Sequence, residues 1–258
     1  MNRTDRPASL KCPSQAVSEA TSFSIESGLF GAAHDSSRSI FAPMHYEPRY
    51  AYPLLVWLHG TGGEERQLMR IMPMVSMRNY VAVAPRGLIA PQSSTDRPQY
   101  GWPQSPDYIE AAEQRVLDAV EAARQRFTIH PKRVFLAGFD CGGTMAFRVA
   151  MDCPRQFAGV LSIGGAFPRL YNPFHQLADS RRIPVFLAIG RDSTVYPPEQ
   201  ACDDLRLFHA AGMSVTLRQY PSGHQLTPQA LRDVDRWIME QITAAPGGVE
   251  VGRNGAAE

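Results

Sequence analysis

The chain alternates short apolar runs with longer amphipathic ones, and this alternation is the feature that most limits its possible folds. Strand-length apolar runs fall at 39–44, 54–58, 81–84, 134–137, 160–163, 185–189 and 215–219. Most end in turns with Gly, Pro or Asp, and several lack the polar alternation of a half-exposed strand, as strands buried on both faces do. We therefore predict a mostly parallel, doubly wound sheet flanked by helices.

Helix-length runs with apolar residues at helical spacing supply the other half of this pattern. The clearest predicted helices are 106–127, 143–151, 198–211 and 228–243. Both ends of the chain are polar or Gly-rich and have no apolar periodicity. We expect a single α/β domain over residues 21–245, with disordered tails at 1–20 and 246–258.

The composition argues against several classes of function. Hydrophobic residues make up 44%, charged residues 20%, and the formal net charge is +1, which predicts neither nucleic-acid nor anionic-membrane binding. The first twenty residues lack the apolar core of a secretion signal, and no run is long enough to span a bilayer. We expect a cytoplasmic protein without membrane insertion that acts on a small-molecule substrate.

The cysteines and glycines give no sign of a metal or a cofactor. The four cysteines are scattered, with no C-x-x-C pair and no His/Cys cluster at metal-ligand spacing. The Gly-rich stretch near residue 60 has no lysine after it, as a phosphate cradle would need. We predict no metal and no cofactor.

The segment V-F-L-A-G-F-D-C-G-G-T-M-A, residues 134–146, is the most informative motif. An apolar strand runs into Gly138, and Gly142 follows Asp140 by two positions, which is the G-x-[nucleophile]-x-G spacing of a strained strand-to-helix turn. Such a turn projects its central side chain, here Asp140. The alternative is a plain βα turn in which Asp140 caps the following helix.

Other strand ends carry residues that fit the same site. L-L-V-W-L-H-G-T-G-G, residues 54–63, ends in a His-Gly loop whose backbone N–H groups could face a developing oxyanion. Asp192 follows the strand 185–189, and His224 follows the strand 215–219. Along the chain, the strand-to-helix turn at Asp140, called the elbow below, is followed by an acid and then by a histidine, which is the order found in α/β-hydrolases. Taken alone, Asp192 is more often a helix cap and His224 a surface side chain.

Together these motifs give the chain a resemblance to the phospholipase/carboxylesterase family of cap-less α/β-hydrolases, related to dienelactone hydrolases and feruloyl esterases. The similar stretches are 58–65, 84–87, Trp102–Pro103, 138–143, Asp192 with Val195, and 223–227. The resemblance covers nearly all of the predicted domain and implies an α/β-hydrolase fold with no cap domain.

The resemblance also implies roles for individual residues. Asp192 would orient the imidazole of His224, and His224 would be the general base. The N–H groups of Cys141 and of Thr61 or Gly62 would form the oxyanion hole. Asp140 stands where this family carries its serine nucleophile.

An aspartate at that position changes the chemistry. A carboxylate that attacks an ester carbonyl gives a high-energy anhydride, whereas it displaces a leaving group at a saturated carbon readily. Haloalkane dehalogenases and epoxide hydrolases are similar in using such an aspartate, but they carry a cap domain for which this chain has no room between 163 and 185. The sequence predicts a hydrolase of ester substrates and leaves open displacement at a saturated carbon.

A third possibility is a catalytically inactive binding protein. Two carboxylates around His224 would favour its charged form and prevent it from acting as a base. The spacing argues against Cys141 as nucleophile, because Gly138 and Gly142 are centred on residue 140. Among the aromatic residues, Trp102 and Phe167 are the candidates for substrate contact, with core packing as the alternative.

Overall fold

The protein, represented by a computed structural model, is described over residues 34–35, 38–89 and 99–244. The predicted tails and the domain ends at 21–33 and 245 lie outside these residues. Among the described residues, no helix combines the length and the apolar character needed to cross a bilayer.

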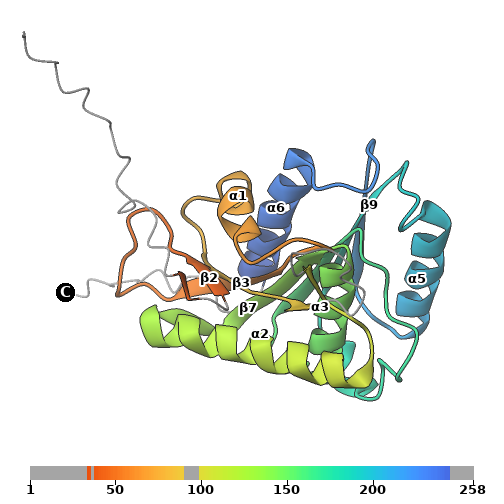
Figure 1. The fold of residues 1–258 in the computed structure, drawn as a ribbon, viewed down its shortest axis with the longest axis horizontal. Helices are drawn as coiled ribbons and strands as arrows, with labels where there is room; N and C mark the ends of the chain where they lie inside the picture. The colour runs from red at the N-terminus through yellow and green to blue at the C-terminus, as the bar shows by residue number, and fades with distance from the viewer. Residues whose placement is uncertain (1–33, 36–37, 90–98, 245–258) are drawn as a thin grey trace, which may run out of the picture.

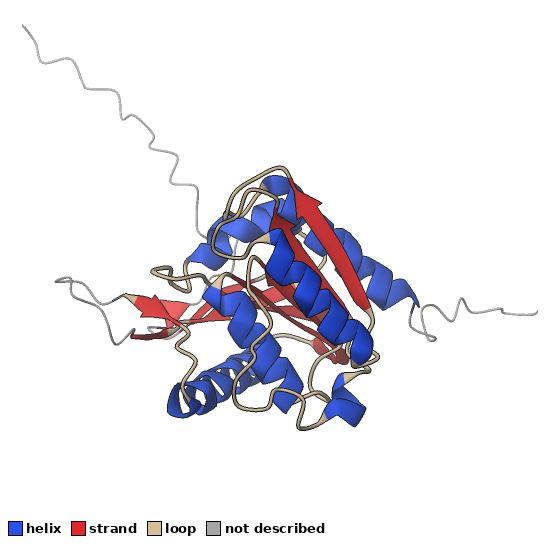
Figure 2. Ribbon diagram, turned by 90° about the vertical axis from the view of Figure 1, so that its right-hand side faces the viewer, coloured by secondary structure: helices blue, strands red, loops and turns tan. Residues whose placement is uncertain are grey.

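The predicted sheet is present, and it is mostly parallel (Figures 1 and 2). Its order is β1-β2-β4-β3-β7-β8-β9-β10, with antiparallel pairing only at the edge where β2 joins β1 and β4. The strands are β1 (His34–Asp35), β2 (Arg38–Phe41), β3 (Tyr52–Leu58), β4 (Val81–Pro85), β7 (Ile129–Phe139), β8 (Gly159–Ile163), β9 (Val185–Gly190) and β10 (Val215–Tyr220). A separate small sheet pairs β5 (Leu88–Ile89) with β6 (Tyr100–Gly101).

The helices cover both faces of the sheet, as a doubly wound fold requires. They are α1 (Gln67–Val75), α2 (Pro106–Arg126), α3 (Cys141–Asp152), α4 (Leu177–Ser180), α5 (Pro198–Ala210) and α6 (Pro228–Ala244). One core lies between the sheet and α2, α3 and α5, and a second lies between the opposite face and α1 and α6 (Figure 1). Strands β3, β4, β8 and β9 are buried almost throughout, which explains their unbroken apolar sequences.

Two differences from the predicted elements trace to proline. The first predicted strand ends early, at Phe41, because Pro43 has no amide to donate to a ladder. Helix α1 was not predicted, because it contains Pro73 and a proline inside a run of residues argues against a helix. Residues 164–184, all of them described, hold only the four-residue helix α4, so the predicted absence of a cap between β8 and β9 is confirmed.

The register of the central strands brings the predicted motifs to one edge of the sheet. Leu58, the last residue of β3, pairs with Gly138 of β7, so the His-Gly loop leaves the sheet beside the elbow. Phe139 pairs with Ile163 of β8, and Gly190 of β9 pairs with Tyr220 of β10. All of these positions are carboxyl ends of parallel strands, where open α/β sheets form their sites.

Candidate active site

Asp140 occupies the sharp turn between β7 and α3. Its φ of 54° and ψ of −126° lie in a region that L residues rarely adopt. The turn requires glycine at two neighbouring positions: a Cβ atom on Gly138 would lie 2.3 Å from the carbonyl oxygen of Gly142, and one on Gly142 would lie 2.3 Å from that of Leu58. The Asp140 side chain makes no capping hydrogen bond to its own helix, so the helix-cap interpretation is wrong.

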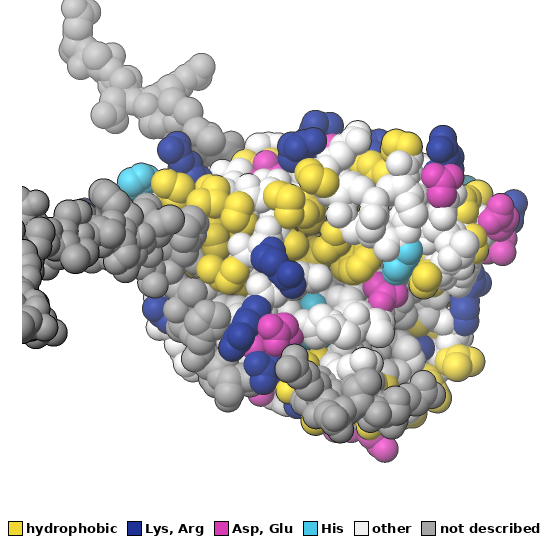
Figure 3. All heavy atoms as spheres, turned by 45° about the horizontal axis from the view of Figure 1, so that its top comes forward, with side chains coloured by type: hydrophobic (Ala, Val, Ile, Leu, Met, Phe, Trp, Pro, Cys, Tyr) yellow, Lys and Arg dark blue, Asp and Glu magenta, His cyan; other side chains and the backbone are white. Residues whose placement is uncertain are grey.

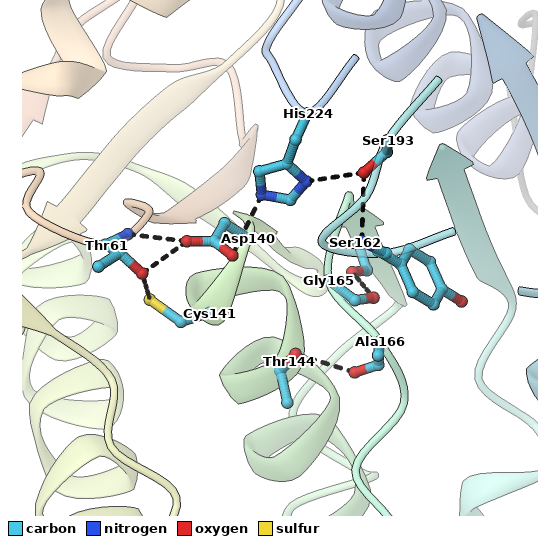
Figure 4. Close-up of polar contacts among 10 residues, drawn as sticks. Thr61, Asp140, Cys141, Thr144, Ser162, Gly165, Ala166, Ser193 and His224 are labelled. Carbon is cyan, nitrogen blue, oxygen red and sulfur yellow. Dashed lines mark hydrogen bonds and ion pairs between the residues drawn. The ribbon is translucent and has the colours of Figure 1, made fainter. Parts of the chain in front are cut away.

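The loop after β3 holds one oxygen of the Asp140 carboxylate (Figure 4). The backbone N–H of Thr61 donates to Oδ2 over 3.1 Å, and the Thr61 hydroxyl donates to the same atom over 2.6 Å. Gly62 does not take part, because its N–H donates to the carbonyl of Tyr100 over 2.9 Å. Of the two predicted donors in this loop, Thr61 is the one that faces the elbow, and its hydroxyl was not predicted from the sequence.

These contacts stabilise the ionised form of Asp140. Burial by itself raises the pKa of the carboxyl group. The hydrogen bonds from the Thr61 hydroxyl and amide, the Cys141 amide and the nearby His224 ring outweigh burial and lower the pKa below its ordinary value. Asp140 is therefore a carboxylate at neutral pH.

His224, on the loop after β10, approaches the other carboxylate oxygen. Its Nε2 atom lies 3.2 Å from Oδ1 of Asp140, an ion-pair distance at which Nε2 nevertheless has no well-directed hydrogen bond. The ring packs against Phe139 with centroids 5.1 Å apart. The Nδ1 atom, on the far side of the ring, lies 3.3 Å from the hydroxyl oxygen of Ser193 (Figure 4).

Asp192 does not contact His224, contrary to the prediction that it orients the ring. Its carboxylate pairs with Arg191, with oxygens 3.2 and 3.5 Å from the guanidinium nitrogens, and its side chain is 60% exposed. The Asp192 amide donates to the carbonyl of Ser222, and the neighbouring Ser193 side chain points inward. Ser193 is 5% exposed and takes the expected place of the acid.

Trp102 and Phe167, the two predicted substrate contacts, are both core residues with 2% exposure. The Trp102 indole N–H donates to the carbonyl of His59 and thereby anchors the His-Gly loop. Phe167 packs between the rings of Phe147 and Phe208. Their role is to support the loops around the site.

Cys141 lies beside Asp140 at the start of α3, and its thiol is not set up for nucleophilic attack. Burial raises the pKa of this thiol, and the Asp140 charge adds to the effect, although a hydrogen bond from Thr61 opposes it. The Thr61 hydroxyl lies 3.4 Å from the sulfur atom. A thiol with a raised pKa holds little thiolate at neutral pH.

His59, which opens the His-Gly loop, is fully buried and serves the backbone. Its Nδ1 lies 2.9 Å from the carbonyl oxygen of Gly60, and its Nε2 accepts the N–H of Gly87 over 2.9 Å. Burial is the main cause that lowers the pKa of this ring. A neutral ring protonated at Nδ1 satisfies both contacts and ties the loop after β3 to the loop after β4.

The sequence profile of one family matches residues 47–242, which is most of the described chain. This chain belongs to the phospholipase/carboxylesterase family. The match includes the elbow, the Thr61 loop, Ser193 and His224.

Curated relatives and solved structures are consistent with this membership. NocK of Nocardia uniformis subsp. tsuyamanensis, provisionally named an esterase, is 29% identical over 148 residues, which cover 56% of this chain but only 41% of NocK. MhqD of Bacillus subtilis (strain 168), provisionally named a hydrolase, is 22% identical and is covered over 98% of its length, against 76% of this chain. The carboxylesterase of Bacillus cereus has the same fold, with a TM-score of 0.64 at 18% identity over 79% of this chain and 93% of its own.

In this member of the phospholipase/carboxylesterase family, the described site has three parts around one carboxylate. The Thr61 amide and hydroxyl hold Oδ2 of Asp140, the Cys141 amide lies close to the carboxylate, and Oδ1 faces His224. One carboxylate, and not two, contacts the imidazole.

Hydrophobic and oppositely charged side chains are interspersed over the face shown in Figure 3, and no large area of one charge covers it.

Proposed function

We propose that this protein is a hydrolase of the carboxylesterase type that acts on small ester-type molecules, with Asp140 in place of the family's nucleophilic serine. The observation that carries the proposal is that the two oxygens of the Asp140 carboxylate have different surroundings. Oδ2 is held by donors from Thr61, and Oδ1 is turned toward the base His224. A carboxylate nucleophile needs one oxygen fixed and the other free to attack.

The position of Oδ2 disfavours attack on the acyl carbon of an ester. The donors that would stabilise the oxyanion of a substrate are already bound to Asp140, and the product of such an attack would be an anhydride. Displacement at the alkyl carbon avoids both problems. Oδ1 forms a C–O bond to that carbon, and the leaving group departs with the electron pair of the bond that breaks; for a carboxylic ester it is the carboxylate.

Hydrolysis of the resulting alkyl ester of Asp140 uses the same groups. His224 takes a proton from water, and the hydroxide adds to Cγ of Asp140. The negative charge then develops on Oδ2, where the Thr61 amide and hydroxyl already donate. The Cγ–Oδ1 bond breaks, and the alcohol leaves with Oδ1 and the proton from His224. Asp140 is left as a carboxylic acid and returns to the carboxylate by releasing its proton to water. The sum is R–X plus water giving R–OH and H–X.

A second candidate is a catalytically inactive homologue that binds small molecules. The observation in its favour is that Asp192 is solvent-exposed and paired with Arg191, so no carboxylate assists the His224 ring from the Nδ1 side. The argument from two carboxylates around one imidazole no longer supports it, because only Asp140 contacts the ring among the described residues.

Single turnover in ¹⁸O-labelled water separates these possibilities. Excess enzyme is mixed with aryl esters, alkyl esters and alkyl halides, and the protein and the products are analysed by mass spectrometry. The proposed route places ¹⁸O in the Asp140 carboxylate and leaves the alcohol unlabelled. Label in the acid product and none in Asp140 would instead mean that water attacks the acyl carbon, and it would exclude displacement at the alkyl carbon by Asp140.

The matched control is Asp140→Asn, which has nearly the same shape but cannot attack. It should lose both the label and the covalent adduct. A wild-type protein that gives no adduct and no product with any member of the panel would favour the inactive homologue.

A further inference from the structure

The Nδ1 side of the catalytic imidazole is contacted by a neutral hydroxyl. Ser193 comes directly after Asp192 on the loop that follows β9, and its Oγ lies 3.3 Å from Nδ1 of His224. Ser193 is 5% exposed, whereas Asp192 extends toward Arg191 and solvent. Two adjacent residues thus face opposite ways. Figure 4 shows the uncharged one, Ser193, beside the ring.

The Ser193 hydroxyl is held in place from behind. The backbone N–H of Tyr196 donates to Oγ over 3.2 Å. The Tyr196 phenol donates in turn to Asp204 over 2.8 Å, and this fully buried carboxylate also accepts the Phe167 N–H over 2.8 Å. Asp204 thus anchors the Tyr196 side chain, and the Tyr196 backbone N–H holds Oγ of Ser193 beside the ring.

The groups around the ring determine what a hydroxyl can do there. Asp140 is on the Nε2 side at 3.2 Å, and Phe139 stacks on the ring. Tyr220 lines the small cavity beside His224, but its phenol donates to Asp233 over 2.8 Å. Asp140 is thus the single carboxylate in contact with the imidazole within the described part of the chain.

A carboxylate at Nδ1 would stabilise the protonated ring. A serine hydroxyl can donate to or accept from a ring nitrogen. As the acceptor from Nδ1–H it adds no charge and leaves the Nε2 lone pair on the Asp140 side.

We propose that Ser193 is the positioning residue of His224, and that it holds the Nδ1–H tautomer so that Nε2 can accept a proton. The effect of Ser193 on catalysis rests on the proposed function. Its effect on the His224 tautomer is independent of that function and can be observed without turnover.

The test is ¹⁵N NMR of histidine-labelled full-length protein, with the His224 signals assigned from a His224→Gln variant. In the neutral wild-type ring we expect Nδ1 to be protonated and Nε2 to be bare. Ser193→Ala should give a mixture of tautomers, and Ser193→Thr, which keeps a hydroxyl, should restore the wild-type pattern. Ser193→Asp should raise the pH midpoint of the ring by about one unit.

Asp192→Asn is the matched control, since it removes the neighbouring carboxylate that does not contact the ring, and it should leave the spectrum unchanged. Where turnover is measurable, Ser193→Ala should lower kcat roughly 10- to 100-fold with KM within about twofold of wild type. A wild-type tautomer pattern in Ser193→Ala, or a shift in Asp192→Asn, would overturn the inference. The expected tautomer shifts in a protein without any turnover would refute the proposed function and leave the role of Ser193 intact.

Discussion

The hydroxyl of Thr61 donates a 2.6 Å hydrogen bond to Oδ2 of Asp140, and the backbone N–H of Thr61 donates to the same oxygen. Oδ2 of Asp140 therefore takes up hydrogen-bond donors of the kind that a serine hydrolase uses to bind the oxyanion of its substrate. In the proposed reaction this is an advantage, because Oδ2 becomes the oxyanion of the second step without moving. For acyl transfer the same contact is an obstacle.

Replacing Asp140 by Ser should therefore create esterase activity. Serine is too short to reach both Thr61 and His224, so it frees the oxyanion donors and provides a hydroxyl that His224 can deprotonate. We expect wild-type protein to show little or no turnover of p-nitrophenyl acetate, and Asp140→Ser to exceed it by roughly 100-fold or more. The release of p-nitrophenol measures both. High wild-type activity that serine-directed phosphonates abolish would show that the nucleophile lies elsewhere.

The Thr61 hydroxyl can be tested separately from the Thr61 backbone. Thr61→Val keeps the shape and the amide donor but loses the hydroxyl, whereas Thr61→Ser retains it. Loss of this hydrogen bond should raise the pKa of Asp140, since the bond favours the ionised form. ¹³C NMR of labelled aspartate measures this shift, and Thr61→Ser should show little of it.

The same pair of variants bears on catalysis. We expect Thr61→Val to slow hydrolysis of the covalent intermediate by about 100-fold, the usual effect of one oxyanion donor, and Thr61→Ser to stay within about threefold of wild type. Equal rates in the two variants would exclude a catalytic role for the hydroxyl.

The backbone at Asp140 predicts a cost in stability. With φ at 54° and ψ at −126°, any residue with a Cβ atom is strained by about 1–3 kcal/mol, and glycine is not. Asp140→Gly should therefore be more stable than Asp140→Ala by about 1 kcal/mol or more, a comparison in which both variants lack the carboxylate. Urea unfolding measures the difference. An alanine variant as stable as the glycine variant would mean that the turn is unstrained.

Much of the architecture could be predicted because it depends on repeated local patterns. Buried parallel strands need unbroken apolar runs, and the runs at 54–58 and 185–189 became β3 and β9. Helix α1 escaped prediction because Pro73 contradicts the local helical pattern and is tolerated only in the tertiary context. The predicted tails and the cytoplasmic location stay predictions.

The candidate site was less predictable, because it depends on the direction of single side chains. The elbow and His224 follow from spacing along the chain, and the structure brings Asp140 and His224 within 3.2 Å. Whether Asp192 or Ser193 faces the ring depends on the backbone hydrogen bonds of the loop after β9, such as those of the Asp192 and Ser193 amides to Ser222 and Gly190, which leave no trace in the sequence. Trp102 was predicted to line the cleft because it is aromatic, but it lies in the core.

The ion pair between Glu65 and Arg86 should stabilise the loops around the site. Two guanidinium nitrogens lie 2.5 and 2.6 Å from the Glu65 carboxylate oxygens, and the Glu65 side chain is 2% exposed. Removing one partner of a buried pair leaves the other uncompensated. We expect Glu65→Gln to lower the free energy of unfolding at pH 7 by about 3 kcal/mol, the lower end for buried pairs, because Arg86 is partly exposed.

The pH dependence of this loss has a definite sign. Burial raises the pKa of Glu65, but the Arg86 hydrogen bonds and charge outweigh it and lower the pKa below its ordinary value. As the pH falls, the unfolded chain takes up a proton at this residue before the folded protein does, so the stabilisation is complete above about pH 5 and declines below about pH 4. Denaturant titrations at pH 7 and pH 4 should therefore show a smaller difference between wild type and Glu65→Gln at the lower pH.

Glu64→Gln is the matched control, since Glu64 is 41% exposed and lies 3.9 Å from Arg66, and it should change stability by less than about 1 kcal/mol at either pH. A difference for Glu65→Gln that is constant with pH would mean that lost packing, rather than the ion pair, destabilises the variant.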